Sequence, residues 1–140
     1  MLYLDIETDG LDIYTNKIVT IQILFPSGKT VILKDPLSLD KVKSVLEKSL
    51  VVGHNLKFDA KFLKHKFGIT LYNVYDTMIA ELVLSGGLYV GQKDVVGLKD
   101  LVARYCGTVM DKTEQTGFIY GVPLTQAQSC LLYTSDAADE

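Results

Sequence analysis

Two acidic residues near the start of the chain, Asp5 and Glu7, stand in the segment YLDIETDGL at residues 3–11. In an extended strand, side chains alternate between faces, so both carboxylates point the same way with their Cα atoms roughly 6.6 Å apart. Two like charges at the end of a buried strand are costly unless a proton or cation lies between them. The spacing therefore predicts a metal site, and its oxygen ligands favour Mg²⁺ or Mn²⁺ over zinc. The alternative is a pair of ordinary solvated acids on an edge strand.

These acids need a strand whose other face is apolar, and the sequence supplies one. Leu2, Leu4 and Ile6 alternate with the polar positions, and a turn follows at residues 9–10. Residues 17–25 and 30–33 read as two further strands joined by a turn. The first three strands are therefore expected to be antiparallel to one another.

The middle of the chain is expected to bring a third carboxylate to this place. Ser38 is predicted to cap a helix over residues 39–48, whose buried side carries Val42, Val45 and Leu46. A short apolar strand at residues 50–54 then leads into a helix in whose first turns Asp59 lies. If this strand lies beside the first and parallel to it, Asp59 faces the first two acids. The alternative is an acid that only complements the helix dipole.

The rest of the chain reads as one strand and three helices. The strand covers residues 70–75, and Asp76 is predicted to be the N-cap of a helix that ends at Leu84 rather than a metal ligand. A helix over residues 95–107 is expected to face inward through four residues: Leu98, Leu101, Val102 and Tyr105. A loop is predicted at residues 108–121, with one more helix beginning at Pro123.

Length and charge narrow the function classes. With 140 residues the chain is expected to form one domain, and it has neither an 18-residue apolar run nor a leader, so we expect a cytoplasmic protein with no membrane partner. A net charge of -3 argues against holding nucleic acid by bulk electrostatics, although bound cations could still reach phosphates. Lys57, Lys61 and Lys64 form one helical stripe, for which a solvated face is favoured over phosphate contact.

Two segments carry a family resemblance. The sequence DIETDGL at residues 5–11 resembles the first motif of DnaQ-like 3′–5′ exonucleases of the DEDD superfamily, and HNLKFD at residues 54–59 resembles the second. Residues 75–80 and 98–101 are similar to the proofreading domain of family A DNA polymerases, so the likeness covers residues 1 to about 128. The resemblance implies a ribonuclease H-like α/β fold, with a mixed five-stranded sheet flanked by helices.

The resemblance also implies a role in metal binding for each of the three acids. Asp5 would be shared by two divalent metal ions, Mg²⁺ or Mn²⁺, while Glu7 would bind one and orient the attacking water, and Asp59 would serve the other. These three residues are the expected catalytic and metal-binding set.

Five further residues are expected at the substrate. Thr8 and Leu11 would line the pocket for the terminal nucleotide, and His54 and Asn55 would shape the site. Phe58 would mainly pack beside it. From the residues alone, Asn55 could equally be only a helix cap and His54 only a polar residue in a turn.

The third motif of the tyrosine subclass is out of register here. Its Tyr and Asp would fall near Leu131 and Ser135, whereas Tyr133 and Asp136 are only three apart. Residues 130–140 back-translate as a transposase adapter, so we expect an incomplete exonuclease domain at residues 1–128 followed by a non-native tail at 129–140. The alternative is a degenerate third motif that uses Tyr133 and Asp136. If the tail is foreign, this chain should be a weak or inactive nuclease.

The function expected for the complete parent is metal-dependent 3′–5′ trimming of single-stranded DNA ends, as the proofreading part of a polymerase. One alternative is an RNA-trimming member of the same superfamily, which the polymerase-like second half disfavours. Another is a non-catalytic nucleic-acid-binding module on the same fold. Clustered acids without a cation destabilise a fold, which counts against a pure scaffold.

Overall fold

The computed structural model describes residues 1–34 and 39–110 of the chain. Three strands come first, two further strands then alternate with helices, and three helices end the described part of the chain. The strands are β1 (Leu2–Thr8), β2 (Ile18–Leu24), β3 (Thr30–Leu33), β4 (Leu50–Gly53) and β5 (Asn73–Asp76). The helices are α1 (Leu39–Lys48), α2 (Leu56–Phe67), α3 (Thr77–Leu84), α4 (Lys93–Val96) and α5 (Leu98–Cys106).

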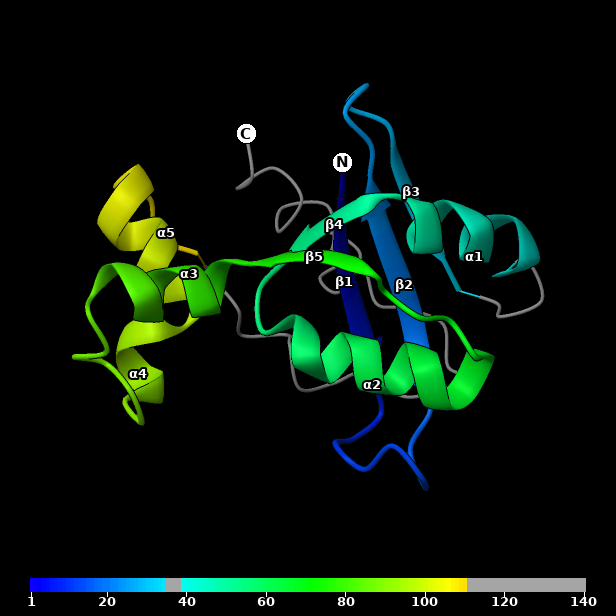
Figure 1. Cartoon of the computed structure of the whole chain (residues 1–140), viewed down its shortest axis with the longest axis horizontal. Coiled ribbons are helices and arrows are strands. Elements are labelled where there is room, and N and C mark those ends of the chain that lie inside the picture. The colour runs from blue at the N-terminus through cyan, green and yellow to red at the C-terminus, as the bar shows by residue number, and fades with distance from the viewer. Residues whose placement is uncertain (35–38, 111–140) are drawn as a thin grey trace.

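The strands form one mixed sheet in the order β3-β2-β1-β4-β5 (Figure 1). β1 pairs antiparallel with β2, and β2 with β3, which confirms the predicted antiparallel unit. β1 also pairs parallel with β4, and β4 with β5. β1 therefore lies at the point where the sheet changes from antiparallel to parallel pairing.

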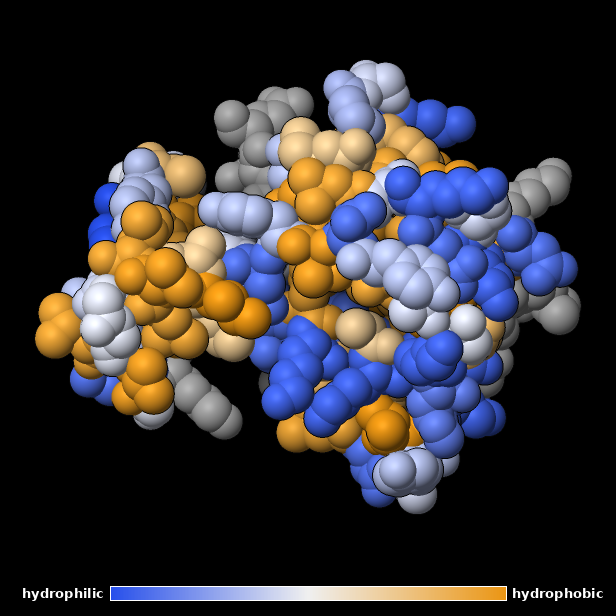
Figure 2. Space-filling view, viewed as in Figure 1, coloured by the Kyte–Doolittle hydropathy of each residue, from blue (hydrophilic) through white to orange (hydrophobic). Residues whose placement is uncertain are grey.

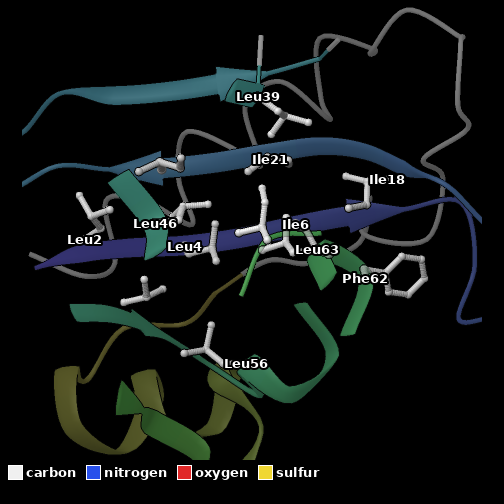
Figure 3. Close-up of a cluster of buried hydrophobic side chains, with 13 residues drawn as sticks. Leu2, Leu4, Ile6, Ile18, Ile21, Leu39, Leu46, Leu56, Phe62 and Leu63 are labelled. Atoms are coloured by element: carbon white, nitrogen blue, oxygen red, sulfur yellow. The ribbon is translucent and has the colours of Figure 1, made fainter. Parts of the chain in front are cut away.

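The core fills the space between one face of this sheet and the helices α1 and α2. The apolar face of β1 packs there because alternation sends its leucine and isoleucine side chains to one side, as predicted. Figure 3 shows these side chains meeting Leu46 of α1 and Leu63 of α2. Val45 of α1 is 38% exposed, so its predicted burial is wrong: Leu39, Val42 and Leu46 form the inward stripe instead.

Helices α3, α4 and α5 gather beside the sheet, beyond the end of β5 (Figure 1). The predicted helix over 95–107 is two helices, because Gly97 has an extended backbone with φ -64° and ψ 150°. Leu101 and Val102 are buried as expected, whereas Tyr105 is 64% exposed. Its phenol donates a hydrogen bond to Glu81 at 2.7 Å, which places the ring at the surface rather than in the core.

This group of helices exposes much apolar surface, seen in orange in Figure 2. The exposed side chains come from α3 and the segment after it: Ile79, Val83, Leu84, Leu88 and Val90. Among the helices that the structure describes, none is both long and apolar enough to pass through a lipid bilayer.

Other predicted boundaries differ by a few residues. β5 begins at Asn73, three residues later than expected, and residues 108–110 have no regular structure. The predicted cap Ser38, most of the predicted loop and the helix after Pro123 lie outside the described residues.

Candidate active site

β1 and β4 separate where the acidic residues begin. Their parallel pairing covers Leu2 with Val51 and Tyr3 with Val52. Gly53 then ends β4, and a Cβ on this residue would lie 2.7 Å from the carbonyl oxygen of Leu4. Only glycine allows such a close approach before the chain turns into α2.

Asp59 of α2 occupies the edge of β1 beyond this point. Its Oδ1 accepts the backbone N–H of Ile6 at 3.1 Å, and the residue is only 4% exposed. Burial, followed by the charge of Asp5, raises the pKa of the Asp59 carboxyl well above its ordinary value. The structure therefore joins the two motifs through the hydrogen bond from Ile6 to Asp59, and Asp5 lies near enough for its charge to raise the Asp59 pKa.

The face of β1 that carries the first two acids is extended by polar residues of β2. Asp5 lies opposite Gln22 in the register, and Glu7 lies opposite Thr20. Both β2 residues are buried, and Gln22 Nε2 donates to Thr20 Oγ1 at 3.5 Å. Gln22 Oε1 has no hydrogen-bond partner among the residues described. Their period-two spacing in β2 was the sequence signal that could have identified them.

The described residues do not contain a complete metal cage. Within 1–34 and 39–110, no three His, Cys, Asp or Glu side chains lie close enough together to hold an ion. Glu7 is half-buried, two residues beyond Asp5 on the same strand, and its joint role with Asp5 and Asp59 stays a prediction. The residues considered for a third motif lie outside the described part of the chain.

A groove of about 530 Å³ runs between residues 11–14 and the beginning of α2. Three of the residues predicted at the substrate line it: Leu11, Asn55 and Phe58. Lys57 and Lys61 line it as well. The groove therefore combines apolar surface with two cationic side chains and one acid, Asp12.

Thr8 and His54 lie apart from this groove. Thr8 Oγ1 donates to the carbonyl oxygen of Gly10 at 2.7 Å, closing the turn after β1. His54 Nδ1 is 2.9 Å from Thr77 Oγ1 at the beginning of α3.

The interpretation of Asn55 as a helix cap needs a correction. Asn55 precedes α2, but its backbone is left-handed, with φ 57° and ψ 40°, and its side chain makes no capping hydrogen bond. The N–H groups of Asn55 and Leu56 donate instead to the carboxylate of Asp76, at 3.0 and 2.8 Å. Asp76 also caps α3 as predicted.

Comparison with known proteins decides the family. Residues 1–133 match the family described as 3′–5′ exonuclease. The chain belongs to this family. DNA polymerase I of Aquifex aeolicus (strain VF5) is 33% identical over 128 residues, which confirms the resemblance to family A polymerases. That match covers 91% of this chain and 20% of the polymerase, so the chain spans about a fifth of its relative.

Solved structures share the fold of this 3′–5′ exonuclease. NrnC of Brucella melitensis is similar over 96% of this chain and 65% of its own, with a TM-score of 0.74 and 26% identity. Escherichia coli RNase D, an exoribonuclease involved in structured RNA processing, is similar over 95% of this chain and 35% of its own, with a TM-score of 0.76 and 22% identity. The fold is ribonuclease H-like, as the sequence resemblance implied.

Proposed function

We propose that this chain forms a metal-dependent 3′–5′ exonuclease domain, over residues 1–128, that removes nucleotides from single-stranded DNA ends. Residues 129–140 are a non-native tail in this proposal. The domain works in the cytoplasm as the proofreading part of a longer protein that also contains a polymerase domain. Relatedness to a DNA polymerase I supports this context.

The buried Asp59 carboxylate beside Asp5 is the observation that carries the proposal. A carboxylate that is 4% exposed and near a second acid is unfavourable as an anion in the metal-free protein. A divalent cation removes this cost, and oxygen ligands suit Mg²⁺ or Mn²⁺. The related NrnC has been solved with bound Mg²⁺.

Three side chains hold the cations in this proposal. Asp5 would hold both ions, Glu7 one of them and Asp59 the other. When bound, the ions would activate water and stabilise the attacking and leaving oxygens. Glu7 would orient the attacking water. Burial would hold the Asp59 carboxylate in one position while the charges at the site change during the reaction.

The terminal nucleotide lies along the groove between residues 11–14 and α2. Leu11 and Phe58 offer apolar surface to a base, and Lys57 and Lys61 offer positive charge to phosphates. This use of the lysines revises the solvated-face interpretation. Asn55 lines the same groove, whereas Thr8 and His54 act from outside it, in the turn after β1 and at the end of β4.

RNA is the alternative substrate. Two proteins of the same fold suggest it: RNase D is an exoribonuclease, and NrnC has been solved bound to pGG. The identity to a DNA polymerase I favours DNA.

The test uses 5′-labelled single strands of DNA and of RNA, incubated with Mg²⁺, Mn²⁺ or a chelator. Because the third motif is out of register, the assay is run on the 140-residue chain and on a version with a genuine third motif joined after residue 128. We expect the completed version to shorten DNA from the 3′ end only with a divalent cation. Faster shortening of RNA would transfer the proposal to the alternative substrate.

Two variants give this assay its control. Asp5→Ala should abolish shortening, whereas Asp40→Ala removes an exposed acid of α1, away from the site, and should leave the rate unchanged. A completed protein that binds single strands but never shortens them would instead be a non-catalytic nucleic-acid-binding module.

A further inference from the structure

One carboxylate, that of Asp76, serves the beginnings of two helices. Its Oδ1 accepts the N–H groups of Met78 and Ile79 in α3, at 2.9 and 3.4 Å. The same carboxylate accepts from Asn55 through Oδ1 and from Leu56 through Oδ2, at the start of α2. The first N–H groups of a helix have no partner within it, so Asp76 satisfies these donors in both helices.

The sheet brings Asp76 to this position. β4 and β5 are parallel, and their register pairs Gly53 with Asp76. Three residues beyond Gly53 the chain enters α2, while directly beyond Asp76 it enters α3. Both helix N-termini therefore begin at the same edge of the sheet, with one anion between them, where each helix dipole favours negative charge.

The α2 half of this arrangement lies at the turn of the helix that carries Asp59. Asp59 lies three residues after Leu56, within the first turn of α2, so the position of its carboxylate depends on where that turn begins. Asn55 is the only non-glycine residue with positive φ among those described, a conformation that costs about 1 kcal/mol without support. The hydrogen bond from Asn55 to Asp76 holds it there.

We propose that Asp76 is a positioning residue of the active site: by fixing the first turn of α2, it holds Asp59 against the N–H of Ile6 and ready for a cation. This inference rests on the proposed function for its catalytic consequence only. The effect on the Ile6 hydrogen bond does not depend on any activity.

Asp76→Asn removes one bond of the arrangement and keeps the others. Asn is as good an N-cap as Asp, so its carbonyl oxygen, in the place of Oδ1, can keep the bonds from Met78, Ile79 and Asn55. Its amide nitrogen then replaces Oδ2 and faces the N–H of Leu56, donor against donor. The variant should therefore retain α3 and the bond from Asn55, and lose only the bond that fixes Leu56 at the beginning of α2.

The experiment measures amide hydrogen exchange by NMR in the metal-free, 140-residue chain. In Asp76→Asn, the Ile6 amide should exchange about tenfold faster, the effect of losing a hydrogen bond or cap of ordinary strength. The amides of Ile21 and Met78 should keep their protection. Titration with Mn²⁺ should show a weaker dissociation constant, by about the same factor.

Glu47→Gln is the matched control. Glu47 Oε1 also accepts a distant backbone N–H, that of Thr70 at 3.2 Å, but it lies beyond the other end of α2. This variant should leave Ile6 exchange and Mn²⁺ affinity unchanged.

Two results would overturn the inference. In the first, Ile6 keeps its wild-type protection in Asp76→Asn. In the second, Ile21 and Met78 lose protection as much as Ile6, which would mean a general loss of stability. If the wild-type chain binds no Mn²⁺, the proposed function fails, but the Ile6 exchange rate still decides whether Asp76 positions Asp59.

Discussion

Asp59 completes the edge of β1 by accepting the backbone N–H of Ile6 at 3.1 Å, beyond the last residue of β1 that pairs with β4. This bond gives a proposed metal ligand a second role in holding the sheet to α2. The two roles need different properties of the side chain. The hydrogen bond needs only an acceptor oxygen, whereas the metal needs a negative charge.

Asp59→Asn should separate these roles. The amide oxygen can still accept from Ile6, and the buried charge disappears. The free energy of unfolding of the metal-free variant should therefore exceed that of wild type by about 1 kcal/mol or more. Cation-dependent nuclease activity should fall by about a hundredfold or more, because a metal ligand is lost. Urea denaturation and the exonuclease assay on the completed protein measure the two effects. A variant that is less stable than wild type and equally active would contradict both expectations.

The stability of the metal-free protein should depend on pH through Asp59. Its folded pKa is raised above the ordinary value of 3.8, so between these two values the folded state binds the proton that the unfolded state has lost. The contribution of Asp59 to stability is therefore largest below pH 3.8 and is lost as pH rises through the folded pKa. Urea denaturation from about pH 4 to about pH 7.5 should show wild type losing stability relative to Asp59→Asn. Saturating Mg²⁺ should remove the difference in slope.

Gly53→Ala should damage the fold at the site. The new Cβ would lie 2.7 Å from the Leu4 carbonyl oxygen and 2.6 Å from Leu56 Cδ2, so β4 or α2 must shift. We expect a loss of about 2 to 3 kcal/mol in the free energy of unfolding. Gly28→Ala is the comparison: its Cβ would meet nothing within 4 Å, and only the backbone strain of φ +76° remains. Equal losses in the two variants would show that the contact at Gly53 is unimportant.

Arg104→Met should destabilise the group formed by α3, α4 and α5. Glu81 is nearly buried, and its carboxylate pairs with Arg104 and accepts from Tyr105. Removing the cation leaves a buried charge with one neutral partner, at a cost of about 2 kcal/mol after allowing for the partial exposure of Arg104. Tyr105→Phe removes only a hydrogen bond and should cost about 1 kcal/mol. The double variant, measured by urea denaturation, should show coupling between the two, and strict additivity would count against a shared network.

The sequence was sufficient where a structural feature depends on local pattern. Alternation in β1 predicted which residues enter the core, and the turn after β2 predicted the hairpin, because both features depend on neighbours a few residues away. The convergence of Asp59 and Asp5 also followed, once β1 and β4 were expected to be parallel neighbours.

Features that depend on distant chain segments could not be read in this way. Asp76 accepts hydrogen bonds at the start of α2 only because β5 brings it there. The left-handed backbone of Asn55 is in contact with it at that point. Tyr105 has the spacing of a core residue, but Glu81 offers it a partner at the surface. Gln22 and Thr20 have the period-two spacing of one strand face, but which acids they lie beside depends on the register with β1.

The hydrogen bond from Ile6 to Asp59 also bears on how relatives of this chain should be compared. A descendant that had given up nuclease activity would still need an acceptor at this position to keep its sheet intact, so selection for folding alone would preserve aspartate or asparagine there. An aspartate aligned with Asp59 is therefore weak support for catalysis in a homologue. Replacement at Asp5, whose own side chain is exposed, is the more informative sign that the activity has been lost.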